Sequence, residues 1–393
     1  MIDLARLPRL VKDRWASTRR DLGMISLLLQ GKHPPPLIPI AAQAVTESAV
    51  QPRALRVEQV VRETPDALTL WLTDPSGAAL RCLPGQFFTV LVPVAGKLER
   101  RAYSASHYVA DGSRLALTCK RIAGGKVSSF LHEYAHPGML LQVLGPSGQF
   151  GVTPQPGLAR KLVLIGGGSG ITPLWAIAQA VLAEEAASTV TLLYGNRSRA
   201  DIIFADALGE LGKAHPQRLV LRHVLSEPSP DFASGSGILD QATITQELGA
   251  LGCLGRDADY FVCGPQPMME AARAVLLREG VAPARIHEER FATPQLAQEE
   301  LPSTTQTVEL AHKGQTTLVS VAPTETILEA GLRHGVMLPF SCTMGGCGAC
   351  KAKLAEGSVA QPEPNCLTSQ ERQAGQVLLC VSHPRTRCRI TVP

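Results

Sequence analysis

Four cysteines near the carboxyl end of the chain have the types and spacing of a metal-cluster site. Cys342, Cys347 and Cys350 follow the pattern C-x4-C-x2-C, and Cys380 comes later in the chain. This order is typical of a plant-type 2Fe-2S cluster held by four thiolates. Glycines between the first three cysteines let the backbone curl tightly enough for the thiolates to converge. The pattern therefore predicts one-electron transfer.

Zinc and disulfides are the two other uses of four cysteines. Structural zinc sites usually contain two C-x2-C pairs, whereas this chain has one such pair, one C-x4 step and one distant cysteine. Disulfide frameworks belong to short secreted chains, and the start of this long chain lacks the features of a secretory signal. The spacing favours the iron-sulfur cluster, with the four cysteines as its metal ligands.

The length and composition predict several domains. With 393 residues the chain is too long for one ordinary core. It contains no uninterrupted apolar run of about 18 residues, so no membrane-spanning helix is expected. The net charge is only +4, and no basic stretch interleaved with aromatic residues indicates nucleic-acid binding. We therefore expect a cytoplasmic protein without a nucleic-acid partner.

Residues 1–32 have the pattern of a basic amphipathic helix. Apolar side chains such as Leu4, Leu7 and Val11 recur at steps of three or four, and Arg and Lys crowd the other positions. A proline-rich stretch, residues 33–39, then acts as a stiff linker. Three roles stay open for the helix: packing on the rest of the protein, peripheral docking on the inner membrane face or on a membrane-bound partner, and targeting, which its aspartates disfavour.

Beyond residues 1–50, which hold this helix and linker, short strand patterns predict an antiparallel β-barrel over residues 51–157. Four strand-like runs separated by Gly, Pro and Asp turns support it, at residues 56–64, 67–74, 86–94 and 114–122.

Two motifs in this region suit a flavin nucleotide. RAYS, residues 101–104, offers an arginine for a phosphate, a tyrosine face for a ring and a serine hydroxyl for a ring nitrogen. GGKVSS, residues 124–129, brings backbone amides to the start of a helix that Ser128 or Ser129 would cap.

Alternating strands and helices over residues 158–291 predict a doubly wound α/β domain with a parallel sheet. It opens with GGGSGITP, residues 166–173, in the order of strand, glycine loop and helix that seats a pyrophosphate, although Ile171 stands where a third glycine is usual. YGNRSR, residues 194–199, ends the next strand, where ribose contacts occur. CGPQPMM, residues 263–269, ends a later strand and starts a helix.

A polar linker, residues 292–305, precedes the cysteine-containing segment, residues 306–393. This last segment has the size of a small ferredoxin-like α+β domain. The motifs, in this order, resemble the ferredoxin-NADP reductase superfamily, and with the appended cluster domain the chain resembles oxygenase reductases. The resemblance covers about residues 52–393 and implies a multidomain protein with a barrel for FAD, a doubly wound NAD(P) domain and a β-grasp 2Fe-2S domain.

The resemblance also implies roles for individual residues. Ser104, near the reactive flavin nitrogen, and Cys263, bordering the nicotinamide, would act at the reacting rings. FAD would be held by Arg101, Ala102, Tyr103, Ser104, Lys120, Gly125, Lys126, Val127 and Ser128. NADH or NADPH would be held by Gly167, Gly168, Gly170, Thr172, Pro173, Asn196, Arg197, Cys263, Gly264 and Pro265. Glu289 and Phe291 would close the edge of the flavin.

The choice between NADH and NADPH stays open. Arg197 and Arg199 could meet the additional phosphate of NADPH, but the Ser-Arg pair of the plant reductases corresponds here to Ser226 and Glu227. A carboxylate at that position would repel the phosphate, which favours NADH.

The resemblance implies that electrons pass from NAD(P)H through FAD and a 2Fe-2S cluster, one at a time, to a terminal oxygenase, hydroxylase or desaturase. Two alternatives stay open. One is the electron-transfer subunit of another dehydrogenase, such as dihydroorotate dehydrogenase, whose cluster cysteines are spaced differently. The other is a redox sensor that binds a partner without turnover, which the complete cofactor motifs disfavour.

Overall fold

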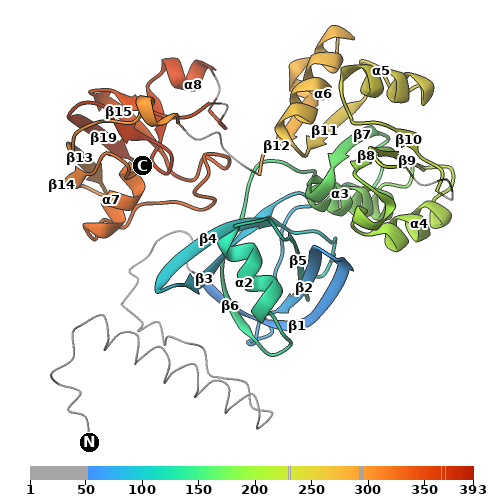
Figure 1. Ribbon diagram of the computed structural model, residues 1–393, viewed down its shortest axis with the longest axis horizontal. Coiled ribbons are helices and arrows are strands. Elements are labelled where there is room, and N and C mark those ends of the chain that lie inside the picture. Colours follow the sequence, from blue (N-terminus) through green and yellow to red (C-terminus); the bar gives the residue numbers. More distant parts are fainter. Residues whose placement is uncertain (1–51, 229, 231, 292–295, 364, 368) are drawn as a thin grey trace, which may run out of the picture. The chain divides into compact units, whose positions relative to one another are not determined.

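The computed structural model describes residues 52–393, except residues 229, 231, 292–295, 364 and 368. The chain divides into two compact units, Met1–Thr46 and Glu47–Pro393, and all the described residues lie in the second. The predicted amphipathic helix, residues 1–32, lies outside the described residues. The described residues form three sheets of five or six strands and a short two-stranded ribbon (Figure 1).

The first of these sheets is an antiparallel barrel. Its strands are β1 (Arg53–Thr64), β2 (Ala67–Thr73), β3 (Phe87–Val94), β4 (Lys97–Ser104), β5 (Leu115–Lys120) and β6 (Leu140–Ser147). They are ordered β4-β3-β6-β1-β2-β5. The two edge strands meet through a bridge between Ala105 and Leu117, which closes the sheet. Helix α2 (Lys126–Tyr134) packs beside β3, β4 and β5 (Figure 1).

The core of the barrel explains the four strands that the sequence pattern predicts, because β1, β2, β3 and β5 all contribute apolar residues to it, such as Leu55, Leu70 and Leu117. Strands β2, β3 and β5 are buried along most of their length. The pattern missed β4 and β6. Strand β4 carries consecutive charged residues, and β6 contains Gly145 and Pro146. Their strand conformation depends on pairing with β3, which both strands flank.

The second sheet is parallel throughout. Its strands are β7 (Lys161–Gly167), β8 (Thr189–Asn196), β9 (Leu219–Leu225), β10 (Gly235–Ser236), β11 (Asp259–Cys263) and β12 (Ile286–Glu289). The order β10-β9-β8-β7-β11-β12 reverses direction at β7. In doubly wound folds a ligand binds beyond the carboxyl ends of the strands at this reversal, which here lies between β7 and β11.

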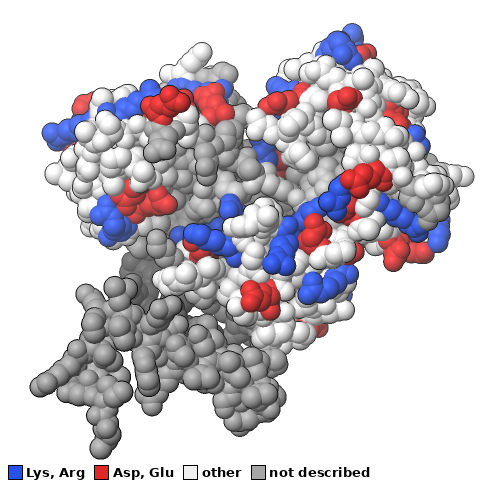
Figure 2. Space-filling model, viewed as in Figure 1, with Lys and Arg blue, Asp and Glu red and all other residues white. Residues whose placement is uncertain are grey.

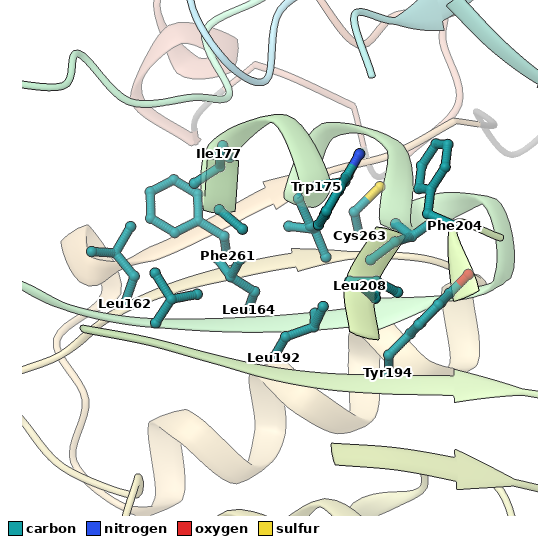
Figure 3. Close-up of a cluster of buried hydrophobic side chains, with 14 of the residues drawn as sticks. Leu162, Leu164, Trp175, Ile177, Leu192, Tyr194, Phe204, Leu208, Phe261 and Cys263 are labelled. Atoms are coloured by element: carbon teal, nitrogen blue, oxygen red, sulfur yellow. The ribbon is translucent and has the colours of Figure 1, made fainter. Parts of the chain in front are cut away.

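Helices cover both faces of this sheet (Figure 1). They are α3 (Ile171–Glu184), α4 (Ala205–Ala214), α5 (Gln241–Ala250) and α6 (Gln266–Arg278). Alternate residues of β7 face opposite cores: Leu162 and Leu164 pack with α3 and α4, whereas Val163 and Ile165 pack with α5 and α6. Figure 3 shows the first of these cores between α3 and the strands. Burial on both faces confirms the doubly wound α/β fold expected from the sequence.

The third sheet belongs to the carboxyl-terminal domain. Its strands are β13 (Gln306–His312), β14 (Gln315–Val321), β15 (Lys351–Glu356), β17 (Gln376–Leu378) and β19 (Cys388–Val392), in the order β14-β13-β19-β15-β17. Strands β16 (Val359–Ala360) and β18 (His383–Pro384) form the small ribbon. Helix α7 (Ile327–Arg333) packs on β14 and starts at a capping box of Thr326 and Glu329, and α8 (Ser369–Gln373) lies beside β17. Parallel pairing of β13 with β19 at the centre of an otherwise antiparallel sheet gives the expected β-grasp arrangement.

The predicted linker is described only over residues 296–305, where one short 3-10 helix, Gln298–Glu300, occurs. In the part of the chain that the structure describes, no helix has the length and apolar character to cross a membrane. Lys and Arg are interspersed with Asp and Glu over the face drawn in Figure 2. Many of these charges form exposed pairs, such as Lys126 with Glu99 at 2.5 Å and Lys161 with Asp257 at 2.7 Å.

Candidate cofactor-binding sites

The four predicted cluster ligands come together. The Cys342 thiol is hydrogen-bonded with those of Cys347 and Cys380, and Cys380 is in turn bonded with Cys350. These hydrogen bonds hold the pKa of Cys342 well below its usual range and raise the pKa values of Cys347 and Cys380. Three of the four cysteines are buried, and Cys347 is half-buried.

The loop that carries three of these cysteines also directs backbone amides at their sulfurs. The Met344 N–H donates to Cys342 Sγ at 3.3 Å, and the Ala349 N–H donates to Cys347 Sγ at 3.5 Å. Gly345 and Gly348 have φ of 70° and 73°, a conformation that glycine adopts without strain. The tight curl expected from the glycines is therefore present.

The donor set suits a 2Fe-2S cluster. The thiol contacts link Cys347, Cys342, Cys380 and Cys350 in that order, and each iron of a 2Fe-2S cluster takes two cysteines. Sulfur-directed amides are the further feature that such clusters use to tune their potential.

In the barrel, Ser104 is the predicted flavin contact with the clearest structural support. It ends β4 opposite Phe87 of β3 and is only 2 % exposed. Its hydroxyl has no hydrogen-bond partner in the protein. A buried hydroxyl without a partner is costly, and a ligand that accepts or donates a hydrogen bond there would remove the cost.

A pocket beside Ser104 joins the barrel to the cluster loop. It is lined by Phe87, Ala102, Ser104, Glu289, Arg290, Phe291, Cys342, Met344 and Gly346. Burial, followed by the nearby negative charge of Cys342, raises the pKa of Glu289 to about 8. The pocket therefore places the predicted flavin contacts, the predicted flavin-edge residues Glu289 and Phe291, and one cluster ligand around a common space.

The other predicted FAD residues lie around β4, β5 and α2. The side chain of Arg101 is exposed, and its Nη1 contacts the Met344 sulfur at 3.5 Å. The Tyr103 hydroxyl accepts a hydrogen bond from the Cys119 thiol at 3.3 Å. Lys120 pairs with Asp66 at 3.4 Å, so this lysine and the Glu99-bound Lys126 both have carboxylate partners within the barrel.

The expected capping of α2 by Ser128 or Ser129 is wrong. The helix starts at Lys126, and its N-cap is Gly125 without a side-chain cap. Ser128 lies inside the first turn, where its hydroxyl accepts a hydrogen bond from the Ile122 N–H at 3.3 Å. A Cβ on Gly125 would lie 2.5 Å from that hydroxyl, which explains the glycine. Val127 is buried in the barrel core.

The glycine loop after β7 approaches the end of β11 closely. A Cβ on Gly170 would collide with the carbonyl oxygen of Cys263, and one on Gly264 would lie 2.9 Å from the backbone nitrogen of Gly167. The Thr172 hydroxyl donates to the Ser169 carbonyl at 3.0 Å, and Pro173 occupies the first turn of α3. The loop, Gly264 and Pro265 thus meet at the sheet reversal, where a dinucleotide is expected.

The end of β8 holds Asn196 and Arg197. The Asn196 carboxamide is close to the Tyr194 hydroxyl, but neither of its polar atoms has a hydrogen bond of acceptable geometry. Arg197 is half of an ion pair with Asp201, with an N–O distance of 2.9 Å. Its backbone carbonyl accepts a hydrogen bond from the N–H of Glu227, the residue that stands where the plant reductases have an arginine.

Cys263 ends β11 as a buried residue, and its predicted role beside the nicotinamide stays a prediction. Its side chain is 0 % exposed and belongs to the core on the α3 face of the sheet. Figure 3 shows it beside Trp175 and Phe204. Burial raises the pKa of its thiol well above the usual range, so the thiol is neutral. Its carbonyl, in contact with Gly170, is the part of the residue nearest to the glycine loop.

Three family models match the chain along its length. They are an oxidoreductase FAD-binding domain at residues 54–151, an oxidoreductase NAD-binding domain at residues 164–274 and a 2Fe-2S iron-sulfur cluster binding domain at residues 310–385. One component of the 1,2-phenylacetyl-CoA epoxidase of Escherichia coli is 36 % identical over 340 residues, covering 85 % of this chain and 95 % of that protein. The chain belongs to the oxygenase reductase family with a carboxyl-terminal 2Fe-2S domain.

Other similar proteins share this architecture. The ferredoxin reductase component of 3-ketosteroid-9-alpha-monooxygenase from Mycobacterium tuberculosis is 36 % identical over 354 residues, covering 84 % of this reductase and 93 % of that protein. The solved structure of phthalate dioxygenase reductase has a TM-score of 0.60 at 24 % identity and covers 87 % of this chain and 97 % of that one, which shows a common fold. The reductase therefore uses FAD, a nicotinamide dinucleotide and a 2Fe-2S cluster, as expected from its sequence.

Several residues at the sites were not identified from the sequence. Phe87 and Met344 line the pocket next to Ser104, and Ser341 joins the cluster loop to the barrel. The sequence could have indicated Met344 as a site residue, since it lies between two cluster cysteines. Nothing in the sequence beyond its strand pattern indicated Phe87, because its position in the pocket follows from its pairing with Ser104 on the neighbouring strand.

Proposed function

We propose that this chain is the reductase component of a multicomponent oxygenase system, which takes electrons from NADH and delivers them singly to a terminal oxygenase. The observation that carries the proposal is the pocket that brings Ser104 of the barrel, Phe291 after β12 and the cluster ligand Cys342 together. Bound FAD accepts a hydride and releases electrons one at a time, and a 2Fe-2S cluster carries a single electron.

The chain's own residues bind and orient these groups. The Ser104 hydroxyl is buried and free to hydrogen-bond the flavin ring, and Phe87 provides aromatic surface in the same pocket. Arg101, whose side chain is exposed and contacts Met344, is available for the FAD pyrophosphate. Gly125 and the amides at the start of α2 form a second anion site.

The dinucleotide would lie over the glycine loop at the reversal of the parallel sheet. Gly167, Gly168 and Gly170 leave room for close backbone approach, and the start of α3 presents amides to a pyrophosphate. The unpaired carboxamide of Asn196 suits a ribose hydroxyl. Gly264 and Pro265 would border the nicotinamide. Cys263 would act through its backbone, because its side chain is enclosed by the core.

NADH is the dinucleotide that the charges favour. Arg197, the predicted partner for the additional phosphate of NADPH, already pairs with Asp201, and the negative charge of Glu227 also acts on it. The final substrate would be bound by the oxygenase partner and not by this chain, so the identity of both is left to experiment. The membrane role proposed for residues 1–32 would be tested by liposome co-sedimentation of the full chain against a chain that starts at Val50.

The test of this function separates the entry of electrons from their exit. Cys347→Ser removes one of four cluster ligands but leaves the barrel and the dinucleotide site unchanged. In stopped-flow experiments with NADH, we expect flavin reduction within about twofold of the wild-type rate, because hydride transfer uses other residues. Reduction of cytochrome c and of the oxygenase should fall at least tenfold. Equal slowing of flavin reduction would contradict the proposal.

The partner can be found directly. Affinity capture of the reduced holoenzyme from the source cells, followed by NADH oxidation assays with each captured oxygenase, would identify the acceptor. Stimulated NADH consumption coupled to a hydroxylated product is the expected result. A protein that binds partners but turns over no electrons would instead be a redox sensor.

A further inference from the structure

The cluster loop is attached to the barrel through the residue that immediately precedes Cys342. The carbonyl of Ser341 accepts a hydrogen bond from Thr89 Oγ1 at 3.2 Å, and the Ser341 hydroxyl donates to Ser147 Oγ at 2.8 Å. Thr89 is 0 % exposed and Ser341 is 1 % exposed. One residue therefore makes two hydrogen bonds to two different strands of the other domain, one of them to a buried partner and the other to a half-buried one.

The two anchor residues lie next to the predicted flavin site. In the barrel sheet, Phe87 pairs with Ser104 on one side and with Ser147 on the other, and Thr89 pairs with Ala102. Phe87, Ser104 and Ala102 all line the pocket. Sheet pairing thus places each anchor directly across from a residue that lines the pocket.

Other contacts between the cluster loop and the barrel are less directional. The Arg100 guanidinium lies over the Phe340 ring at 5.3 Å, and Arg101 Nη1 contacts Met344 Sδ at 3.5 Å. Cation–π and sulfur contacts tolerate sliding and rotation, whereas hydrogen bonds weaken steeply when their angle changes. The Ser341 bonds are therefore the contacts that determine where Cys342 stands relative to the pocket.

We propose that Ser341 is a positioning residue for electron transfer between the flavin and the cluster, with Thr89 and Ser147 as its anchors. This inference rests on the proposed function, because it requires both cofactors. Functional constellations need their supporting groups held to within about half an ångström, and buried hydrogen bonds to rigid strands supply such support. Loosening the loop would increase the average separation of the two cofactors without changing either one's own surroundings.

Thr89→Val is the most direct variant. It retains the shape of the side chain but removes the donor, leaving the buried Ser341 carbonyl without a partner. Thr89→Ser retains the donor and is the conservative rescue. Ser147→Ala removes the second anchor at a half-buried position, so it carries the test if Thr89→Val does not fold. Ser382→Ala is the matched control, since Ser382 is a buried serine of the cluster domain whose hydroxyl donates to Gln361 at 3.0 Å.

Stopped-flow measurements on the holoenzyme with NADH should resolve two phases. We expect flavin reduction at the wild-type rate in every variant. Cluster reduction should be about five- to tenfold slower in Thr89→Val and Ser147→Ala, in line with the loss of one hydrogen bond from a docked arrangement. Thr89→Ser and Ser382→Ala should match the wild type. The potential of the cluster and its electron paramagnetic resonance spectrum should not change.

A second readout does not depend on electron flow. Hydrogen exchange of a peptide covering residues 338–346 should be faster in Thr89→Val than in the wild type, both with and without bound FAD, and unchanged in Ser382→Ala. Wild-type cluster reduction in both anchor variants, equal slowing in Ser382→Ala, or an altered cluster spectrum would overturn the inference. A wild-type protein that binds no FAD or cluster would overturn the proposed function and the inference with it.

Discussion

Arg197 is held by Asp201 through two hydrogen bonds, from Nε to Oδ2 at 3.1 Å and from Nη2 to Oδ1 at 2.9 Å. Asp201 is 8 % exposed, and Ser198 donates to it from both its amide and its hydroxyl. Burial acts to raise the pKa of Asp201, but the hydrogen bonds from Ser198 and Arg197 lower it overall, so the carboxylate is charged at neutral pH. An arginine that already satisfies a carboxylate is poorly placed to bind a phosphate.

Asp201→Asn should therefore weaken the preference that we propose for NADH. Without the carboxylate charge, Arg197 can turn toward the additional phosphate of NADPH. We expect the ratio of kcat/KM for NADPH to that for NADH to rise about tenfold, which corresponds to about 1.4 kcal/mol. Asp257→Asn, which removes an equal charge from the exposed pair with Lys161, is the control and should leave the ratio unchanged. An unchanged ratio in Asp201→Asn would contradict the assignment.

Ser104→Ala should have opposite effects on the apoprotein and the holoprotein. In the absence of FAD the buried hydroxyl has no partner, so its removal should leave the thermal midpoint of the apoprotein equal or higher. With FAD the variant should bind more weakly and accept hydride about tenfold more slowly, since one hydrogen bond to the flavin is lost. Calorimetry with and without FAD measures the first effect, and stopped-flow absorbance measures the second. Destabilisation of both forms by the same amount would show a structural role only.

Gly170→Ala should damage the dinucleotide site. The added Cβ would collide with the Cys263 carbonyl, forcing the start of α3 away from β11. We expect an increase in KM for NADH of at least tenfold, with FAD content unchanged. Gly212→Ala is the matched control: Gly212 lies in α4 with open space around its Cα, and alanine there should stabilise the helix by about 0.5–1 kcal/mol. Titration of NADH binding and thermal unfolding distinguish the two variants.

His107 should make stability dependent on pH. It lies among the rings of Trp71, Trp175 and Phe204, and burial, aided by the positive charge of Arg114, lowers its pKa from 6.5 to about 4. Between these two values the unfolded chain binds a proton that the folded chain does not, so stability is lost as pH falls from 6.5 toward 4.

The size of this effect is measurable by denaturant unfolding. At pH 5 the loss should be about 2 kcal/mol relative to pH 7, from the difference between the two pKa values. In His107→Phe, which keeps an aromatic ring without a titrating group, the part of the slope due to this residue should disappear. Some slope should remain, because burial also lowers the pKa of His223 to about 4. An identical pH profile in the variant would exclude this role of His107.

Residues at the ends of regular elements were the most predictable. The cysteine spacing, the glycine loop after β7 and the start of α6 after Pro265 all restrict the backbone locally, so their chemistry can be read without knowing the fold. The capping of α2 was mispredicted because its glycine N-cap and the inward turn of Ser128 depend on packing against the barrel. The predicted domain boundaries and the ligand contacts of individual site residues stay predictions.

Arg197 illustrates the same limit at a functional position. Its type and place at the end of β8 suggest a phosphate partner, but the helical turn Arg199–Asp201 brings a carboxylate back to it. Whether Arg197 and Asp201, four residues apart, form an ion pair depends on the turn that the backbone makes between them, and composition does not specify that turn. Strands β4 and β6 show the limit for the fold, since neighbouring strands stabilise segments whose own sequences favour no regular structure.

The cysteine spacing alone indicated the 2Fe-2S cluster, because that spacing is a local requirement of the cluster, whereas FAD, NAD(P)H and the direction of electron flow were implied by the resemblance of the motifs to the ferredoxin-NADP reductase superfamily. The relative positions of the predicted flavin site and the cluster loop depend on the tertiary structure. Thr89, Ser147 and Ser341 are far apart along the chain, and only the sheet register of the barrel and the docking of the cluster loop bring them into hydrogen-bonding distance. Hydrogen bonds are satisfied by whichever groups become neighbours after burial, so the contact that positions Cys342 has no signature in the sequence.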